Sequence, residues 1–203
     1  MVALVFLVLP RPIADWSALF LFVAASATDW LDGYLARAWR QVSRFGAMLD
    51  PIADKAMVIV ALITLCALSG PRMEIIVPAV VIAFREVFVS GLREFLGNSA
   101  KTLKVTKLAK WKTTVQMIAI AVLLAKGIFA HELIERSIGM DPSLVAAIMQ
   151  GQEVDHFGLI WFERATNIAR FAGEVLLAIA ALLTLITGWD YFAKAAPLLK
   201  EPT

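Results

Sequence analysis

Two apolar segments decide the fold of this chain: Thr28-Asp29-Trp30-Leu31-Asp32-Gly33-Tyr34-Leu35-Ala36-Arg37 and Gly46-Ala47-Met48-Leu49-Asp50-Pro51-Ile52-Ala53-Asp54-Lys55. They hold four aspartates within 26 residues, and the rest of each segment is apolar enough to lie in lipid. Ionisable side chains are costly inside a membrane and are rare there unless they serve a function. The two segments therefore predict membrane helices that carry a functional site.

Helical spacing would gather these aspartates on two faces. Asp29 and Asp32 are three residues apart, and Asp50 and Asp54 are four apart, so each pair shares one side of a helix. A loop of about eight residues makes the two helices antiparallel neighbours. Four carboxylates in low dielectric need neutralisation, and oxygen-only ligands suit Mg²⁺ or Mn²⁺. The residues predict a divalent-metal site, with an ion-pathway cluster as the alternative.

Small residues accompany the aspartates. Gly33 and Ala36 lie on the face of the first pair, and Gly46 lies one turn before Asp50. We expect them to leave room for a nucleotide or a pyrophosphate against the backbone. Close helix packing is the alternative use for such residues.

The spacing Asp-x2-Asp-Gly-x2-Ala-Arg-x8-Gly-x3-Asp-x3-Asp resembles the signature of the CDP-alcohol phosphatidyltransferase family. Its eight fixed positions make it much more specific than a short glycine motif. Three further segments resemble the branch of that family that uses glycerol 3-phosphate: Arg85-Glu86-Val87, Leu92-Arg93-Glu94-Phe95 and Lys110-Trp111-Lys112-Thr113-Thr114-Val115-Gln116. The resemblance runs from about Ala24 to the end of the fifth apolar segment.

The resemblance implies an enzyme that transfers the phosphatidyl group of CDP-diacylglycerol to glycerol 3-phosphate, giving phosphatidylglycerophosphate and CMP. It implies a pair of Mg²⁺ or Mn²⁺ ions on Asp29, Asp32, Asp50 and Asp54, with Asp54 also as the general base. It further implies a homodimer. The expected CDP-binding residues are Thr28, Asp29, Gly33, Ala36, Arg37 and Gly46.

Basic residues predict the site of the anionic acceptor. Arg85 and Arg93 are two helical turns apart on roughly one face, and guanidinium groups suit phosphate oxygens. We expect Lys104, Lys110 and Lys112 to complete this pocket at the membrane rim. In the alternative, a carboxylate on a neighbouring helix neutralises Arg85 and the lysines contact only anionic lipid.

The composition supports a polytopic membrane protein. Apolar residues make up 60% of the 203 residues, and the mean hydropathy of +0.77 is far above that of a soluble domain. Cys66 is the single cysteine, which excludes an internal disulfide framework and a cysteine metal site. We expect no nucleic-acid partner.

Apolar runs predict one all-α domain over residues 1–203, a bundle of six transmembrane helices. Residues 1–10 are too short to cross a bilayer, which needs about 20 residues, so we expect them to be the end of a truncated first helix. The other spans are expected at about residues 16–38, 45–68, 74–97, 111–130 and 165–189. Residues 131–162 should form a polar connection outside the membrane, in which His131 and His156 are solvated. Arg170 and Glu174 should pair within the last span.

The distribution of charge predicts the orientation. One side of the membrane is expected to carry the basic residues Arg37, Arg40, Arg44 and Arg93 and five lysines. The connection over residues 131–162, on the other side, contains more acidic than basic residues. The positive-inside rule places the basic side, and with it the aspartates, at the cytoplasmic face of a bacterial inner membrane.

Two alternatives to this function stay open. The signature describes the CDP half of the reaction, so the acceptor could instead be serine, inositol, inositol phosphate or phosphatidylglycerol. A cation-coupled transporter is the rival class, although the inverted repeats typical of transporters are not evident.

Overall fold

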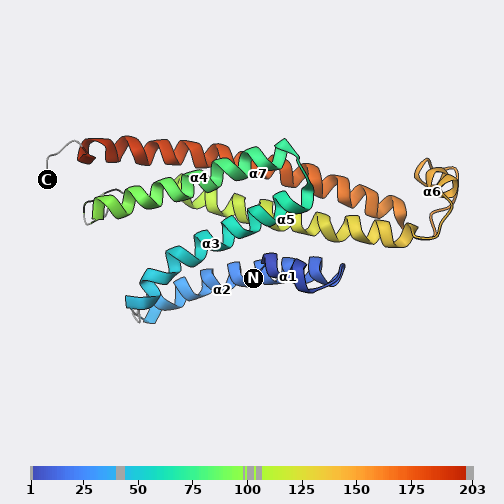
Figure 1. The fold of residues 1–203 in the computed structure, drawn as a ribbon, viewed down its shortest axis with the longest axis horizontal. Helices are drawn as coiled ribbons and strands as arrows, with labels where there is room; N and C mark the ends of the chain where they lie inside the picture. Colours follow the sequence, from blue (N-terminus) through green and yellow to red (C-terminus); the bar gives the residue numbers. More distant parts are fainter. Residues whose placement is uncertain (1, 40–43, 98, 100–102, 104–106, 200–203) are drawn as a thin grey trace. The chain divides into compact units, whose positions relative to one another are not determined.

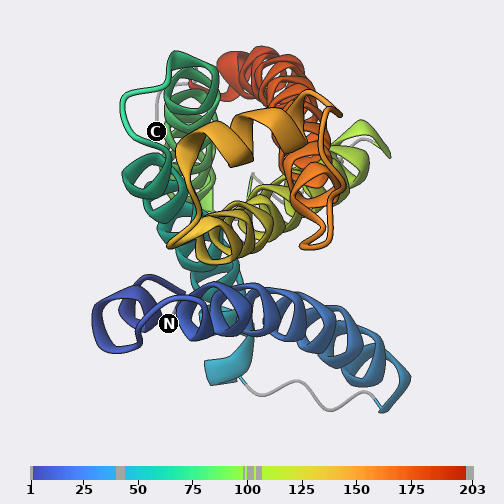
Figure 2. The same cartoon turned by 90° about the vertical axis from the view of Figure 1, so that its right-hand side faces the viewer.

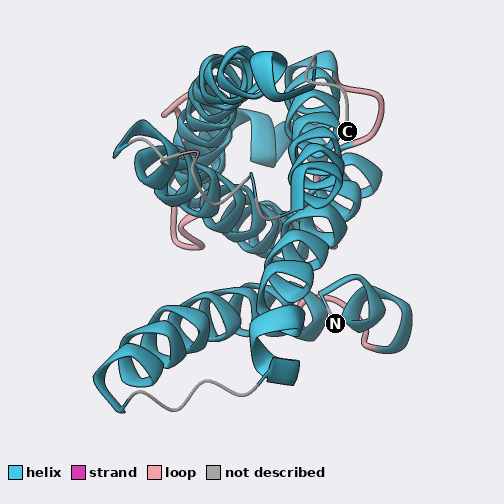
Figure 3. Cartoon of the chain, turned by 90° about the vertical axis from the view of Figure 1, so that its left-hand side faces the viewer, coloured by secondary structure: helices cyan, strands magenta, loops and turns pink. Residues whose placement is uncertain are grey.

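The computed structural model describes residues 2–39, 44–97, 99, 103 and 107–199. Its regular elements are helices, and the described part contains no strand (Figure 3), which confirms the all-α prediction. In chain order (Figure 1) they are α1 (Val2–Val8), α2 (Ile13–Trp39), α3 (Arg44–Ser69), α4 (Met73–Leu96), α5 (Lys107–Ser137), α6 (Pro142–Met149), α7 (Leu159–Ala195) and the short 3₁₀ helix η2 (Ala196–Leu199).

Four helical stretches are long and apolar enough to cross a membrane. They are Ile52–Ser69, Met73–Leu96, Trp111–Ser137 and Leu159–Leu199. Each overlaps a span predicted from the sequence, so a polytopic helical membrane protein is supported. In α2 the corresponding apolar stretch among the described residues, Ile13–Thr28, is shorter. The count of six spans therefore stays a prediction.

The connection between the last two spans is shorter than predicted. Helix α5 continues to Ser137 and α7 already begins at Leu159, so the connection with its short helix α6 covers only residues 138–158 (Figure 2). Helix α5 extends into a polar stretch because side chains four residues apart pair on its surface. His131 Nε2 lies 3.2 Å from Glu135 Oε1, and Arg136 Nε lies 3.2 Å from Glu132 Oε2. Of the two histidines predicted to be solvated, His156 is exposed as predicted, whereas His131 is half-buried, with 17% of its side chain exposed.

Two aspartates order this connection. Asp141 caps α6 by accepting the backbone N–H of Ser143 at 2.8 Å, and Pro142 occupies the start of the helix. Asp155 accepts the backbone N–H groups of Leu159 and Ile160, each at 2.9 Å, at the start of α7. Each carboxylate thereby satisfies donors that a helix N-terminus leaves without an intrahelical partner.

The chain divides into two compact units, each with its own apolar core. The first contains residues 1–47 and 120–173, and the second contains residues 48–119 and 174–203. In the first unit Phe22, Ile120 and Leu159 are almost completely buried. In the second unit Leu62, Ile82 and Leu177 are buried to the same degree.

Ion pairs and hydrogen bonds join α4 to α5 and α7 within the second unit. Arg72 Nη2, just before α4, lies 2.7 Å from Glu174 Oε1 on α7. The predicted partner of Glu174 was Arg170, which instead donates to Asn167 at 3.4 Å on its own helix. The pairing within α7 was therefore wrong, because Glu174 faces the start of α4.

Candidate functional site

The signature residues lie on two helices, as their spacing predicted. The C-terminal part of α2 carries Asp29, Asp32, Gly33, Ala36 and Arg37, and the N-terminal part of α3 carries Gly46, Asp50 and Asp54. The backbone thus gives each aspartate pair its shared helical face.

The described side chains do not test the metal and CDP sites. The side chains of Asp29, Asp32 and Asp50, and those of Ala36 and Arg37, lie outside the described residues. Among the side chains that the structure does describe, no three His, Cys, Asp or Glu residues gather. Asp54 is exposed, and the Thr28 hydroxyl donates to the Ala24 carbonyl at 2.8 Å. The metal and CDP sites therefore stay predictions.

The second unit brings together two of the predicted acceptor-binding residues. Arg85 on α4 and Lys112 on α5 both contact Oε1 of Glu86, with Arg85 Nη1 at 3.4 Å and Lys112 forming a hydrogen-bonded ion pair. We call these three residues the charged cluster. Their side chains are 15%, 6% and 12% exposed for Arg85, Lys112 and Glu86 respectively. Ionic groups so buried interact strongly with one another and with any ion that approaches.

The charged cluster carries one net positive charge, since two cations share one carboxylate. Burial of charge costs free energy, which makes this cluster a candidate functional site. A cluster of this composition favours an anion, and its guanidinium group matches the geometry of phosphate oxygens.

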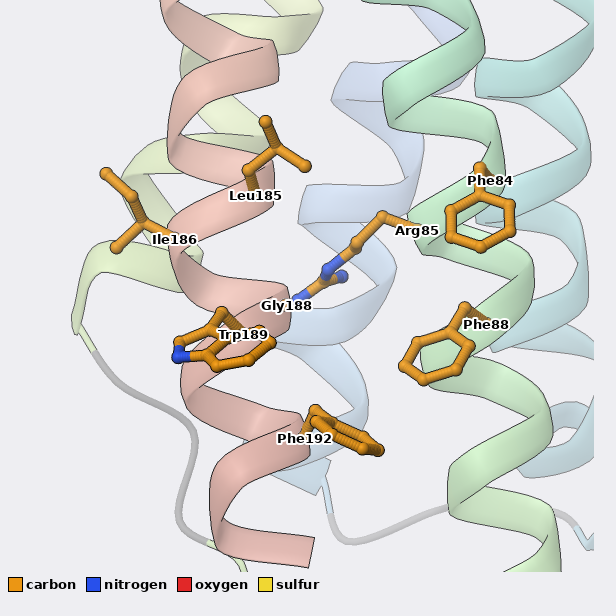
Figure 4. A pocket seen from close by; sticks show the side chains of 8 residues that line it. All are labelled: Phe84, Arg85, Phe88, Leu185, Ile186, Gly188, Trp189 and Phe192. Atoms are coloured by element: carbon orange, nitrogen blue, oxygen red, sulfur yellow. The ribbon is translucent and has the colours of Figure 1, made fainter. Parts of the chain in front are cut away.

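Helix α7 forms the other side of the cluster. Arg85 Nη2 donates to Thr187 Oγ1 at 3.4 Å, and that hydroxyl donates to the Leu183 carbonyl at 2.8 Å. The Arg85 side chain reaches from α4 toward Gly188 on α7 (Figure 4). A Cβ atom at position 188 would lie 2.9 Å from Arg85 Cγ, closer than such atoms normally approach. The glycine therefore makes room for the arginine.

Arg93 takes a place further along the same two helices. Its Nε donates to the Tyr191 hydroxyl at 3.3 Å, and its Cζ lies 5.4 Å from the centre of the tyrosine ring. Both Arg85 and Arg93 thus contact α7, which confirms that they share a face of α4. Lys104 and the side chain of Lys110 lie outside the described residues, so their predicted role is untested.

An open hollow of about 620 Å³ lies between α4 and α7, with Arg85 in its wall. Its lining, labelled in Figure 4, is otherwise mostly aromatic and aliphatic, and consists of Phe84, Phe88, Leu185, Ile186, Gly188, Trp189 and Phe192. Apolar surroundings strengthen the hydrogen bonds and ion pairs of the guanidinium group.

Sequence reasoning missed four residues of this site: Glu86, Thr187, Gly188 and Tyr191. Glu86 was visible as an acid beside Arg85 inside a predicted span, and the carboxylate that pairs with Arg85 lies on the same helix instead of a neighbouring one. The α7 residues gave no signal, because their importance depends on how α7 faces α4. Lys112 is too buried to contact only lipid, which excludes that alternative for this residue.

Comparison with known proteins agrees with the signature. The sequence pattern of the CDP-alcohol phosphatidyltransferase family matches residues 1–186. A protein of Cereibacter sphaeroides named CDP-diacylglycerol–glycerol-3-phosphate 3-phosphatidyltransferase is 54% identical over 201 residues, which cover 98% of this chain and 90% of the relative. A protein of the same name from Haemophilus influenzae is 42% identical, with 92% of this chain and 81% of the relative covered. This chain therefore belongs to the CDP-alcohol phosphatidyltransferase family.

Proposed function

We propose that this protein transfers the phosphatidyl group of CDP-diacylglycerol to glycerol 3-phosphate, with release of CMP. The observation that carries the proposal is the 54% identity, over 98% of the chain, to a relative named for this reaction. The charged cluster supports the choice of an anionic acceptor, because it carries a net positive charge in an apolar environment.

The chemistry of the donor set fits divalent cations. The four aspartates on α2 and α3 offer only carboxylate oxygens, the ligands that Mg²⁺ and Mn²⁺ prefer. We propose that Asp29, Asp32, Asp50 and Asp54 hold two such ions. When bound, the ions would neutralise the negative charge of the pyrophosphate and of the leaving CMP.

We assign the proton transfer to Asp54. Its carboxylate accepts the proton of the attacking glycerol phosphate hydroxyl as the hydroxyl oxygen bonds to the lipid-bearing phosphorus. The bond from this phosphorus to the bridging oxygen of the pyrophosphate breaks, and CMP leaves with that oxygen. The residues proposed to bind and orient the CDP group are Thr28, Asp29, Gly33, Ala36, Arg37 and Gly46.

The acceptor phosphate would bind at the charged cluster and its neighbours. Arg85 and Lys112 supply cationic donors from α4 and α5, and Arg93 supplies a third from the same face of α4. Lys104 and Lys110 are proposed to complete the pocket. Binding here would hold the acceptor in one orientation, which converts attack on the phosphorus into an effectively unimolecular step.

We also propose that the protein lies in a bacterial inner membrane as a homodimer, with α2 crossing the membrane and the aspartates facing the cytoplasm. The basic residues in and beside the connection from α2 to α3, and those in and beside the connection from α4 to α5, support this orientation.

The test is Mg²⁺-dependent CMP release from CDP-diacylglycerol by the purified protein in lipid–detergent micelles. Glycerol 3-phosphate, serine, inositol phosphate and phosphatidylglycerol are offered separately. We expect release with glycerol 3-phosphate alone. Release with a different acceptor would contradict the acceptor assignment and keep the reaction type, whereas no release with any of the four would favour the transporter alternative.

A further inference from the structure

We propose that Glu86 and Gly188 are positioning residues for Arg85, and that both thereby control the affinity for the acceptor. Neither residue is expected to touch the acceptor. The inference rests on the proposed function, since it assumes that Arg85 binds the acceptor phosphate.

Glu86 fixes the charged cluster from the α4 and α5 side. A single oxygen, Oε1, contacts Arg85 Nη1 at 3.4 Å and also forms the ion pair with Lys112. Without this carboxylate, two long cationic side chains would repel each other, and their burial leaves this repulsion only weakly screened. Glu86 thus holds together two cations that would otherwise adopt separate positions.

Helix α7 fixes the opposite side of the guanidinium group. Thr187 Oγ1 accepts from Nη2, while Glu86 accepts from Nη1, so the two terminal nitrogens are held by different helices. Arg85 Nε is buried and makes no hydrogen bond within the described part of the chain, so these two contacts set the orientation of the group.

Gly188 allows this arrangement by having no side chain. An added Cβ would meet Arg85 Cγ at 2.9 Å and Nε at 3.4 Å. Arg85 would have to shift, because the Cβ belongs to a helix backbone that cannot easily move away. A shift of about 1 Å in a binding group is enough to change rates by up to about 100-fold.

The main test compares Gly188→Ala with Gly91→Ala. Both replace a glycine inside a helix by alanine, a change that favours the helix by itself. A Cβ at position 91 would meet no atom within 4 Å, so Gly91→Ala is a matched control. We measure KM for glycerol 3-phosphate, KM for CDP-diacylglycerol and kcat in lipid–detergent micelles.

For Gly188→Ala we expect KM for glycerol 3-phosphate to rise about tenfold, which corresponds to about 1.4 kcal/mol. KM for CDP-diacylglycerol should stay within about twofold of the wild-type value. The substitution disturbs only a contact with the acceptor, so binding of the other substrate should not change. Gly91→Ala should resemble the wild type. An unchanged acceptor KM in Gly188→Ala, or an equal rise in Gly91→Ala, would overturn the role of Gly188.

A second variant separates positioning from charge neutralisation. Glu86→Gln increases the positive charge of the cluster but removes the shared carboxylate. If Glu86 only neutralises charge, the acceptor anion should bind more tightly in this variant. If Glu86 positions Arg85 and Lys112, the acceptor KM should rise despite the added charge. A lower KM would therefore refute the positioning role of Glu86.

Thr187→Val tests the α7 contact by itself, because it removes the hydroxyl that binds Arg85, together with its local bond to the Leu183 carbonyl, and keeps the side-chain volume. We expect a smaller rise in acceptor KM than for Gly188→Ala. If Glu86→Gln misfolds and does not elute as a single species in detergent, Thr187→Val and Gly188→Ala are compared with the wild type instead. Unchanged acceptor KM values in both variants would overturn the proposal.

A binding measurement distinguishes failure of the inference from failure of the proposed function. Glycerol 3-phosphate should raise the unfolding temperature of the wild type, since a ligand that binds the folded state stabilises it. If glycerol 3-phosphate raises the unfolding temperature of the wild type but no CMP is released, the proposed function fails. In that case, loss of the temperature rise in Gly188→Ala would still support the inference. A rise of equal size in the wild type and in Gly188→Ala, or no rise in either, overturns the inference.

Discussion

At the scale of single residues, Asp54 differs from the other three aspartates in its proposed role. All four would bind metal, but only Asp54 would also accept a proton during the reaction. The variant Asp54→Asn keeps the size of the side chain and removes its basicity. Its effect should therefore fall on the chemical step more than on substrate binding.

For Asp54→Asn we expect kcat to fall by roughly 10²–10⁴-fold, the range typical for loss of a general base. Binding of CDP-diacylglycerol should weaken much less. The measurement is CMP release under saturating substrates, together with KM for CDP-diacylglycerol. A variant that keeps most of its turnover would disprove the assignment of Asp54 as the base.

Arg85 is the second residue with a prediction of its own. Replacing it by alanine removes the guanidinium group that we expect to bind the acceptor phosphate. Hydrogen bonds to charged groups contribute about 1.5–3 kcal/mol, so KM for glycerol 3-phosphate should rise about 10- to 100-fold. Arg164→Ala, which changes an exposed arginine on α7, is the control and should leave that KM unchanged. An equal KM in the wild type and in Arg85→Ala would leave Arg85 with a structural role only.

The sequence alone could predict some residues of this site and not others. Arg85, Arg93 and Lys112 stand out because each is a charge within or beside an apolar run. Gly188 and Thr187 do not stand out, because glycine and threonine are ordinary residues in membrane helices. Their effect comes from the position of α7 against α4, which is a property of tertiary packing and leaves no local pattern.

At the scale of helices, the apolar runs located the spans but not their ends. Helix α5 continues through His131 to Ser137 although that part is polar. Pairs of charged residues four apart extend a helix beyond its apolar stretch, and a hydropathy window does not detect them. The start of α7 depends on the side-chain cap of Asp155, which the apolar pattern does not contain.

Asp155 gives a prediction for the start of α7. Desolvation acts to raise the pKa of this carboxyl, but the backbone N–H groups of Ile160, Leu159 and Phe157 outweigh it and lower the pKa below its ordinary value. Because the folded-state pKa is lowered, the stabilisation is present above the unfolded-state pKa of about 3.9 and is lost as the pH falls through the folded-state value.

In Asp155→Asn the charged cap is lost at neutral pH. We expect amide hydrogen exchange at residues 157–162 to become several-fold faster, and the difference from the wild type should disappear in acid as the wild-type carboxyl takes up its proton. Glu153→Gln changes a neighbouring exposed acid and should leave these rates unaltered. Faster exchange in both variants would show that the general charge of the connection matters, and not the cap.

At the scale of the whole molecule, family and helical class could be predicted because both depend on local features of the sequence. The eight-position signature lies within 26 residues, and each apolar run marks its own helix. The contacts among α4, α5 and α7 join residues about 26 to 102 positions apart, and no local pattern encodes such contacts. The orientation in the membrane lies between these two cases. It can be predicted from the sequence, but only by summing the charge of several connections that are far apart in the chain.

This orientation leads to a prediction about the two sides of the protein. Arg37, Arg40 and Arg44 flank the connection between α2 and α3, whereas the connection between α5 and α7 contains Asp141 and Asp155. The first connection should therefore face the cytoplasm and the second the opposite side. With Cys66 replaced by serine, the variants Gln41→Cys and Gln152→Cys place a single thiol in each. In intact bacteria a membrane-impermeant maleimide should label only the thiol at position 152, and both thiols after the membrane is permeabilised. Labelling at position 41 alone in intact cells would reverse the orientation and would separate the aspartates from the cytoplasmic pool of soluble acceptors.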